Sequence, residues 1–439
     1  MRPSSISSGI YADSALTPDG WLRDMSIYFD TDGSIKSVRP GYADPDLPVA
    51  AGPVIPGMVN IHSHAFQRGM VGRTQVFSDP DDDFWSWRKA MYDFVIRLNP
   101  DTYRVQAEAL YREMVEHGYT SVCEFHYIHN EVSGKPYSDP AAMSIALIEA
   151  AESAGIRLCL LPVLYTYGGF DQRELTGGQL RFGKSVPQFL TMMDRLNSHL
   201  AGNSTVTLGY APHSLRAVSK DGMEDLIAHR NDAGRGSPIH IHVAEQLPEV
   251  KECLQTYGAR PVEYLLSSAE VDSTWCLIHA THIEDFEIKR VSASGAVVGL
   301  CPTTESDLGD GVFPLRKFVC AGGKYGLGSD SNVSVSPGEE IRCLESMQRS
   351  SMRLRNVDGA ISDLGVATIR YQNAVSGGLS VSGHSGTFMT AGSPADLVVL
   401  NASAELLAGK TADEMLNAHL LSGSNRSIDS VYTAGRKIT

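Results

Sequence analysis

The fold of this chain is indicated first by residues 54–64, VIPGMVNIHSH, an apolar run that ends in two histidines. Residues two apart in a strand point to the same side, so His62 and His64 would share one side of a strand end. Two imidazoles in that arrangement can bind one metal ion. A His-x-His pair alone is weak support, because most such pairs are ordinary surface histidines. The pattern gains weight only if other apolar runs also end in residues that can bind a metal.

The composition is that of an ordinary globular protein, with 439 residues, 42% hydrophobic and 20% charged. The formal net charge is −14 and no basic stripe runs along the chain, which argues against nucleic acid or an anionic membrane as a partner. No apolar stretch approaches the ~20 residues of a membrane-spanning helix, and the N-terminus lacks the apolar core of a signal peptide. Seven cysteines without CxxC spacing favour free, buried thiols over a disulfide framework. We therefore expect a cytoplasmic protein.

Eight short apolar runs recur, each followed by sequence compatible with a helix. They are residues 54–61, 120–125, 158–164, 207–211, 238–243, 275–279, 296–301 and 324–328. Amphipathic stretches between them include residues 102–116, 140–154, 186–199, 221–229 and 250–268. Apolar strands alternating with helices indicate a parallel sheet buried on both faces, and eight such units predict a (β/α)8 TIM barrel of the α/β class. The alternative is an open doubly wound sheet, but no Gly-rich dinucleotide-binding turn follows the first run.

The two ends of the chain do not follow the eightfold pattern. Both contain short alternating segments separated by Gly, Pro and Asp turns, which is typical of β-hairpins. We expect residues 1–53 and 376–439 to form one small β-sandwich domain beside a barrel over residues 54–375. Residues 65–100 form a long connection after the first strand, and connections of that length are often lids or interface elements. This connection contains Phe84, Trp85, Trp87 and Arg88.

Catalytic groups in a barrel come from the carboxyl ends of its strands. Those ends supply three histidines and a carboxylate as candidate metal ligands: His62, His64, His242 and Asp330. This set suits one Zn²⁺ ion, with Fe²⁺ or Mn²⁺ as alternatives. His240 has the same parity as His242 and could replace it, but the adjoining V-A-E segment favours His242.

Three residues are candidates for proton transfer in a site where the metal would activate a water molecule. Asp330 could contact the metal and also take the proton from that water. Glu245 could pass a proton to a leaving nitrogen, and His279 could hydrogen-bond the water or the developing tetrahedral centre. Structural explanations compete with these roles. Asp330 could cap a helix, and a single strand histidine such as His126 is usually a core residue.

The chain resembles the amidohydrolase superfamily in five segments. They are PGMVNIHSH (56–64), HIHVAE (240–245), LIHATH (277–282), LGSDS (327–331) and ADLVVL (395–400). Binuclear members of the superfamily have a metal-bridging lysine at the fourth strand, whereas that strand here ends in His213. The resemblance therefore implies one metal and the mononuclear, deaminase-like branch, which hydrolyses C–N bonds.

A denser resemblance, over residues 54–345, is to the N-formimino-L-glutamate iminohydrolases (formimidoylglutamate deiminases) of histidine degradation. It is carried by segments such as HSHAFQRGM (62–70), FWSWR (84–88), APHSLRAV (211–218), GLCPTTE (299–305) and SDSNVSVSP (329–337). The resemblance implies an enzyme that releases ammonia from formiminoglutamate and leaves N-formylglutamate. It also implies zinc on the four candidate ligands, with proton transfer by Glu245 and His279.

The same resemblance implies four substrate contacts, from Gln67, Tyr127, His213 and Arg216. Arg88 is similar to an arginine that the family contributes to the neighbouring subunit's site, which implies a homodimer. A glutamate moiety carries two carboxylates, and the two arginines suit them. One departure is Asn332, where the family's segment would have histidine. Because it lies just past Asp330, we expect it to bear on substrate positioning.

Two other functions stay open from the sequence. The first is a related mononuclear enzyme that deaminates a purine, a pterin or another formimino compound. The second is a barrel that has lost catalysis and serves in assembly, which the intact ligand and proton-transfer residues disfavour. Arg88, Arg216 and the FWSWR segment favour a small dicarboxylate substrate.

Overall fold

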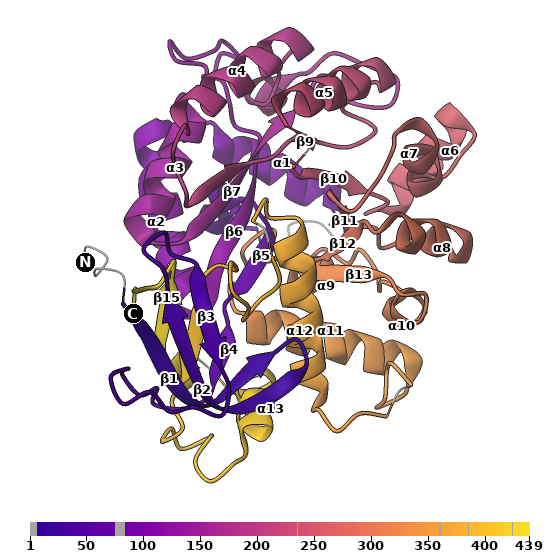
Figure 1. Cartoon of the computed structure of the whole chain (residues 1–439). Coiled ribbons are helices and arrows are strands. Elements are labelled where there is room, and N and C mark those ends of the chain that lie inside the picture. Colours follow the sequence, from indigo (N-terminus) through magenta and orange to yellow (C-terminus); the bar gives the residue numbers. More distant parts are fainter. Residues whose placement is uncertain (1–6, 75–83, 235, 360, 385, 424) are drawn as a thin grey trace.

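The computed structural model describes residues 7–74, 84–234, 236–359, 361–384, 386–423 and 425–439, with the backbone alone for residues 84–86. The central part of the chain alternates parallel strands with helices (Figure 1). The strands are β5 (Met58–Ser63), β6 (Tyr119–His126), β7 (Arg157–Leu164), β8 (Val206–Leu208), β9 (Ala211–Pro212), β10 (Ile239–Val243), β11 (Trp275–His279), β12 (Val297–Leu300) and β13 (Lys324–Leu327). Nearly all of their residues are buried, as expected for strands covered on both faces.

These strands form a closed ring. They pair in parallel as β5–β6–β7–β8, with β9 also on β7, and as β10–β11–β12–β13. Parallel bridges join the two groups at both edges, between Tyr210 and Ile239 and between Ser63 and Asp330. Closure on both sides is what a (β/α)8 barrel requires, so the predicted fold class is confirmed.

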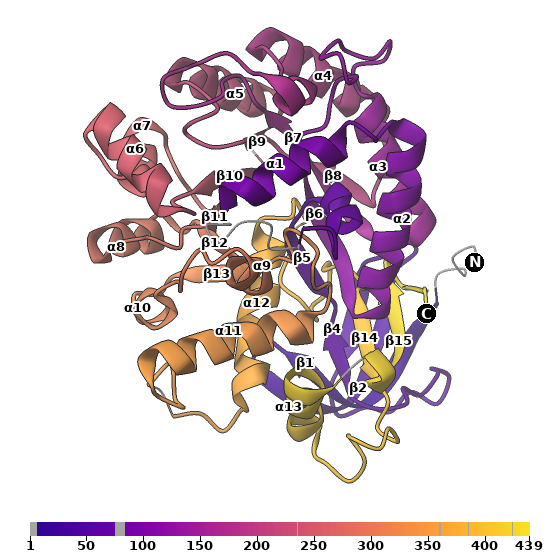
Figure 2. The same ribbon diagram turned by 180° about the vertical axis from the view of Figure 1, so that it is seen from behind.

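Most of the described helices surround the ring, as the view from behind shows (Figure 2), whereas the helix Ala412–Ser422 lies beside the sheet formed by the two chain ends. The described helices are η1 (Ala65–Met70), α1 (Phe84–Val95), α2 (Pro100–Glu116), α3 (Ala142–Ala154), η2 (Gly177–Arg181), α4 (Val186–His199), α5 (Lys220–Ala233), α6 (Leu247–Tyr257), α7 (Pro261–Ser268), α8 (Asp285–Ser294), α9 (Pro302–Asp307), α10 (Leu315–Cys320), α11 (Pro337–Met352), α12 (Val366–Ser380), α13 (Ala412–Ser422) and η3 (Asn425–Ser427). The stretch 250–268 forms two helices, because Gly258 ends α6 with a φ of 68° and Pro261 begins α7. Among the described helices, none is both long and apolar enough to cross a membrane.

Both ends of the chain pair into one seven-stranded sheet beside the ring, visible as the indigo and yellow strands of Figure 1. Its order is β16 (Arg436–Lys437), β15 (Ile428–Thr433), β14 (Leu397–Leu400), β4 (Val54–Pro56), β1 (Gly9–Thr17), β2 (Gly20–Phe29) and β3 (Ile35–Arg39). A buried ion pair connects this sheet to the barrel, because Arg157 at the start of β7 donates from Nε to Asp396 at 3.1 Å. The domain limits given by the sequence stay a prediction.

The first apolar run, residues 54–61, is divided between the two sheets. Val54–Pro56 pairs with β1 and β14, whereas Met58–Ser63 pairs with β6. Gly57 lies between them, and a Cβ there would come within 2.2 Å of the Thr120 side chain. The run reads as one strand in the sequence because both halves are equally apolar and buried.

Candidate active site

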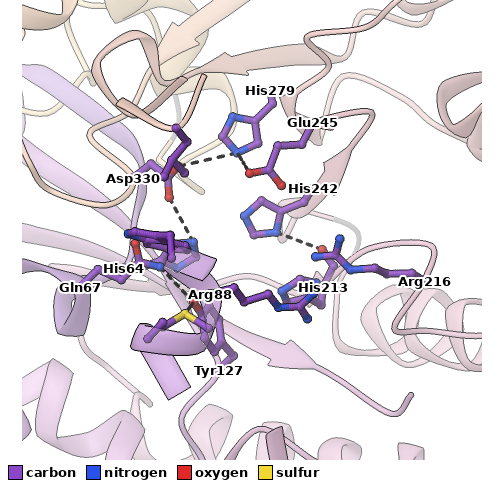
Figure 3. Close-up of a pocket in the computed structure, with 13 residues that line it drawn as sticks. His64, Gln67, Arg88, Tyr127, His213, Arg216, His242, Glu245, His279 and Asp330 are labelled. Carbon is purple, nitrogen blue, oxygen red and sulfur yellow. Dashed lines mark hydrogen bonds and ion pairs between the residues drawn. The ribbon is translucent and has the colours of Figure 1, made fainter. Parts of the chain in front are cut away.

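One pocket lies among the carboxyl ends of the barrel strands (Figure 3). Thirteen residues line it: His64, Gln67, Trp87, Arg88, Met91, Tyr127, His213, Arg216, His242, Glu245, His279, Leu308 and Asp330. Every residue predicted for the site is in this lining except His62, which is fully buried. The lining has two parts. We name His64, His242, Glu245, His279 and Asp330 the histidine–carboxylate face, and Gln67, Arg88, Tyr127, His213 and Arg216 the cationic face.

The four predicted metal ligands meet at one point. His62 Nε2 lies 3.1 Å from His64 Nε2 and 3.0 Å from His242 Nε2. Asp330 Oδ1 lies 3.5 Å from His62 Nε2 and 3.3 Å from His64 Nε2. Ligand atoms about 2.1 Å from a tetrahedral zinc ion are roughly 3.4 Å from one another. These four distances, each of which includes His62 or His64, are close to that value and support a site for one divalent cation.

The backbone determines which nitrogen of each imidazole faces this cluster. His64 Nδ1 lies 2.8 Å from the Phe125 carbonyl and His242 Nδ1 lies 3.1 Å from the His213 carbonyl, so both Nδ1 atoms carry a proton. Burial lowers the pKa of His62 and His242 well below the ordinary value, and that of His64 to about 3. Neutral nitrogens whose lone pairs converge repel one another unless a cation lies between them. The donor set therefore fits a metal.

Asp330 joins the cluster from the segment after β13, where its φ of 46° is left-handed. Asn332 connects that segment to β5, because its Nδ2 donates to the carbonyls of His64 and Asp330 and to Ser63 Oγ at 3.0–3.2 Å. Asn332 is fully buried and does not line the pocket. The expectation that this departure affects substrate positioning stays a prediction. Asn332 hydrogen-bonds to the segments that carry His64 and Asp330.

His279 lies between two carboxylates, as Figure 3 shows. Its Nε2 is 3.7 Å from Glu245 Oε1 and 3.7 Å from Asp330 Oδ2. Burial lowers the pKa of His279, but the carboxylates of Glu245, Glu305 and Asp330 outweigh burial and raise it to about 10. Burial also raises the pKa of Asp330 to about 7, against the opposing charge of His279. The three predicted proton-transfer residues thus form one connected set.

Two buried glutamates that sequence reasoning missed support this set. Glu249 in α6 accepts the backbone N–H groups of Ala244 and Glu245 at 3.1 and 3.0 Å, in a segment where Ala244 has a φ of 52°. Glu305 in α9 accepts from His279 Nδ1 at 3.2 Å. Both acids lie in the first turn of the helix after a strand. That shared position is the signal that could have identified them.

The cationic face offers polar atoms that lack partners. Arg216 is buried, and its Nε has no hydrogen-bond partner among the residues that the structure describes. Gln67 Nε2 donates to the Tyr127 hydroxyl at 3.1 Å, while Gln67 Oε1 likewise has no partner in the described ranges. Burial, together with His242 and Arg216, lowers the pKa of His213 well below its ordinary value, so this imidazole is neutral. Unpaired buried groups are costly, so this face suits a polar, anionic ligand.

Arg88 reaches the cationic face from α1, the helix that follows the long connection. Its Nη2 donates to the Tyr165 hydroxyl at 2.9 Å. Within the single chain, Arg88 lines the chain's own pocket. Its implied contribution to a neighbouring subunit stays a prediction. Residues 75–83 of the predicted lid, and the side chains of Phe84 and Trp85, lie outside the described residues.

The histidines interpreted as structural do not line the pocket. His240 Nε2 lies 2.8 Å from the Val381 carbonyl, and its ring is fully buried. The structure thus brings His242, and not His240, to the cluster. His126 is buried beside the rings of Tyr103 and His129.

The arrangement matches known proteins over nearly the whole chain. Residues 54–438 match the model of the Amidohydrolase family, and residues 7–46 match that of "Formimidoylglutamate deiminase HutF, N-terminal domain". A formimidoylglutamate deiminase of Pseudomonas aeruginosa is 42% identical over 431 residues, which are 98% of this chain and 94% of the relative.

Solved structures show the same fold over nearly the whole chain. The crystal structure of an amidohydrolase from Brucella melitensis gives a TM-score of 0.92 at 40% identity, covering 98% of this chain and 94% of that one. A guanine deaminase from C. acetobutylicum, at 20% identity and a TM-score of 0.81 over 98% of this chain and all of that one, shares the fold. The chain therefore belongs to the amidohydrolase family, among the formimidoylglutamate deiminases.

Proposed function

We propose that this chain hydrolyses N-formimino-L-glutamate to N-formyl-L-glutamate and ammonia, a step of histidine degradation. One observation carries the proposal: a single pocket joins the metal-ligand cluster to two arginines. The formimino group is an amidine-like C=N carbon open to attack by water, and the glutamate moiety bears two carboxylates. The metal-ligand cluster would face the formimino end of this substrate, and the arginines would face its carboxylates, within the same cavity.

Recognition is assigned to the cationic face. Arg216 and Arg88 would pair with the substrate carboxylates, because planar guanidinium groups bind carboxylates through two parallel hydrogen bonds. The neutral groups of Gln67, Tyr127 and His213 would add hydrogen bonds that orient the substrate. The Pseudomonas aeruginosa relative, similar over nearly its full length, supports this substrate over a purine.

Hydrolysis is assigned to the histidine–carboxylate face. A divalent cation on His62, His64, His242 and Asp330, when bound, lowers the pKa of water into the neutral range and so supplies the nucleophile. Asp330 has one oxygen at the ligand cluster and the other 3.7 Å from His279 Nε2. That second oxygen would accept the proton that the attacking water loses.

Glu245 is assigned the transfer of a proton to the departing nitrogen. His279, between Glu245 and Asp330, would stabilise the charge that develops as the formimino carbon becomes tetrahedral. The bond from that carbon to the terminal nitrogen breaks, and the nitrogen leaves as ammonia. The oxygen of the consumed water becomes the formyl oxygen, so one water enters for each ammonia released.

We further propose zinc, a homodimer and a cytoplasmic location. Zinc is supported by the ligand set of imidazole nitrogens and one carboxylate, although iron or manganese would accept the same ligands. The dimer is supported by the resemblance of Arg88 to an arginine that serves a neighbouring subunit. The location is supported by seven free cysteines, all within the described residues and five of them buried.

Ammonia release from the purified, zinc-supplemented protein tests the function. We expect turnover of formiminoglutamate, with a kcat/KM about tenfold or more above that of formiminoaspartate, because a shorter substrate cannot keep both carboxylates on the arginines. Guanine and adenosine should release no ammonia. Turnover of those purines without turnover of formiminoglutamate would reject the substrate, and no turnover of any compound together with no bound metal would reject the enzyme.

A further inference from the structure

We propose that Glu305 is a positioning residue that fixes His279 through Nδ1, so that Nε2 of this histidine faces Glu245 and Asp330. The proposal rests on the proposed function, since it assigns a role within the same site. Glu305 does not line the pocket and contacts neither the pocket space nor the metal-ligand nitrogens directly. Its action on the reaction would therefore pass through His279.

Glu305 has one buried carboxylate oxygen with two donors. Its Oε1 accepts from His279 Nδ1 at 3.2 Å and from the backbone N–H of Cys301 at 2.9 Å. The side chain lies in the first turn of α9, directly after β12, and only 3% of the residue is exposed. A buried carboxylate oxygen at this distance holds a proton on Nδ1 of His279, which donates to it.

His279 lies at a left-handed turn at the end of β11. His279 has a φ of 68° and Ala280 a φ of 47°, so the chain leaves the strand through a left-handed turn at this point. Non-glycine residues in that region cost free energy and persist when their surroundings hold them. Glu305 is the hydrogen-bond partner that the structure gives to the His279 side chain.

The opposite edge of the ring is left for the reaction. His279 Nε2 is buried and has no hydrogen-bond partner among the described residues, at 3.7 Å from both Glu245 Oε1 and Asp330 Oδ2. A rotated ring would turn carbon atoms toward those carboxylates. Where a carboxylate holds the histidine of a catalytic triad, its replacement by the amide lowers kcat by about 10⁴, and partners of metal-site histidines typically contribute about 10- to 100-fold.

Glu340 provides a matched control. It is also a buried glutamate, and it accepts from the backbone N–H of Thr303 at 3.0 Å and from its hydroxyl at 2.6 Å. It lies on α11 and does not line the pocket. Glu340→Gln thus makes the same change from acid to amide at a second buried glutamate, outside the pocket lining.

The test compares Glu305→Gln, Glu305→Ala and Glu340→Gln with the wild type for ammonia release, metal content and thermal stability. Glu305→Gln should lower kcat by about 10- to 100-fold, with KM within about twofold and wild-type metal content, because only the charge behind the histidine is lost. Glu305→Ala should lose more. A kcat for Glu305→Gln within about twofold of wild type, or an equal loss in Glu340→Gln, would overturn the proposal.

Ligand atoms of His279, Cys301 and Glu305 all lie within 4.8 Å of one another, so these residues could instead form a second cation site. A variant of Cys301 distinguishes that alternative from the positioning role of Glu305. Cys301→Ser keeps the backbone N–H that Glu305 binds and removes only the thiol. It should turn over at the wild-type rate. A loss of kcat as large as that of Glu305→Gln would favour the cation site and contradict the positioning role.

The Nδ1–H of His279 tests the proposal without any turnover. In protein labelled with ¹⁵N-histidine, with the signal assigned by a His279→Gln variant, this Nδ1–H should be protected from exchange with water in the wild type and in Glu340→Gln. In Glu305→Ala the Nδ1–H should exchange faster, because its acceptor is lost. If the wild type failed to act on formiminoglutamate, the proposed function would fail, while this measurement would still decide the role of Glu305.

Discussion

The histidine–carboxylate face and the cationic face of the pocket draw on the barrel to different extents. The first is made at strand ends, where His242, Glu245, His279 and Asp330 lie on or within two or three residues of β10, β11 and β13. The second is mixed, because Tyr127 and His213 directly follow β6 and β9, whereas Gln67 comes from η1 and Arg88 from α1, segments that connect strands. Only the cationic face thus uses residues from the connections, which are the parts that vary most readily when one barrel serves different substrates.

The two faces are also held in different ways. On the histidine–carboxylate face, Glu249 and Glu305 accept backbone and ring N–H groups, and Ala244, His279 and Asp330 all have positive φ. On the cationic face, Arg216 Nε and Gln67 Oε1 lack partners among the described atoms. Buried acceptors therefore fix the backbone and rings of the first face, which leaves His279 Nε2 without a partner among the described residues, whereas the second face has unsatisfied groups that a polar ligand would complete.

Removal of the cation should give the largest effect, and it should affect turnover but not binding by the cationic face. Dialysis against a chelator should abolish turnover and lower the thermal midpoint, because an ion that binds the folded chain stabilises it. Binding of the product N-formyl-L-glutamate, measured by calorimetry, should persist through the arginines. Loss of product binding to the same extent as turnover would show that the two faces do not act independently.

Glu245→Gln should give the next largest effect, with turnover reduced by about 10²- to 10⁴-fold and metal content and KM near normal. The amide keeps the volume of the side chain but cannot transfer the proton. Glu252→Gln, at an exposed position of α6, the helix that follows Glu245, is the control and should match the wild type. Full activity in Glu245→Gln would remove this residue from the mechanism.

Arg216→Ala should act on the other face and raise KM by about 10- to 100-fold, since a hydrogen bond to a charged group contributes about 1.5–3 kcal/mol. The value of kcat should change far less. Arg216→Lys should recover part of the loss, because a lysine keeps the charge without the planar fork. A lowered kcat with an unchanged KM would contradict the assignment.

Acid should weaken the scaffold behind both faces. Burial lowers the pKa of His129 to about 3 and that of His240 to about 4. In the unfolded chain these histidines have a pKa near 6.5. As the pH falls from about 6.5 toward 4, the unfolded chain therefore takes up protons at these histidines and the folded chain does not. The free energy of unfolding should therefore fall by up to about 1.4 kcal/mol per pH unit for each such histidine. Urea midpoints at pH 7.5, 6 and 5 measure this, and His240→Gln should reduce the slope; a constant midpoint would contradict it.

The sequence by itself determined the alternation of strands and helices and the four residues predicted as metal ligands. Strand ends of a parallel barrel meet at one rim, so a ligand-type residue at each end is sufficient to predict that His62, His64, His242 and Asp330 converge. It could not choose between His240 and His242 on periodicity, because two residues of equal parity point to the same side. Nor could it divide residues 54–61 between two sheets, since both halves are equally apolar.

Only the tertiary structure decided which residues support the chemistry. Glu305 is 26 residues from His279, and Asn332 is 268 residues from His64, so neither contact has a local pattern in the sequence. The position of Asn332 in the chain suggested a bearing on the substrate, and only the structure shows that its hydrogen bonds join β5 to the segment after β13. Local sequence specifies backbone periodicity and ligand type, but the partner of a buried polar group is set by which segments the closed ring brings together.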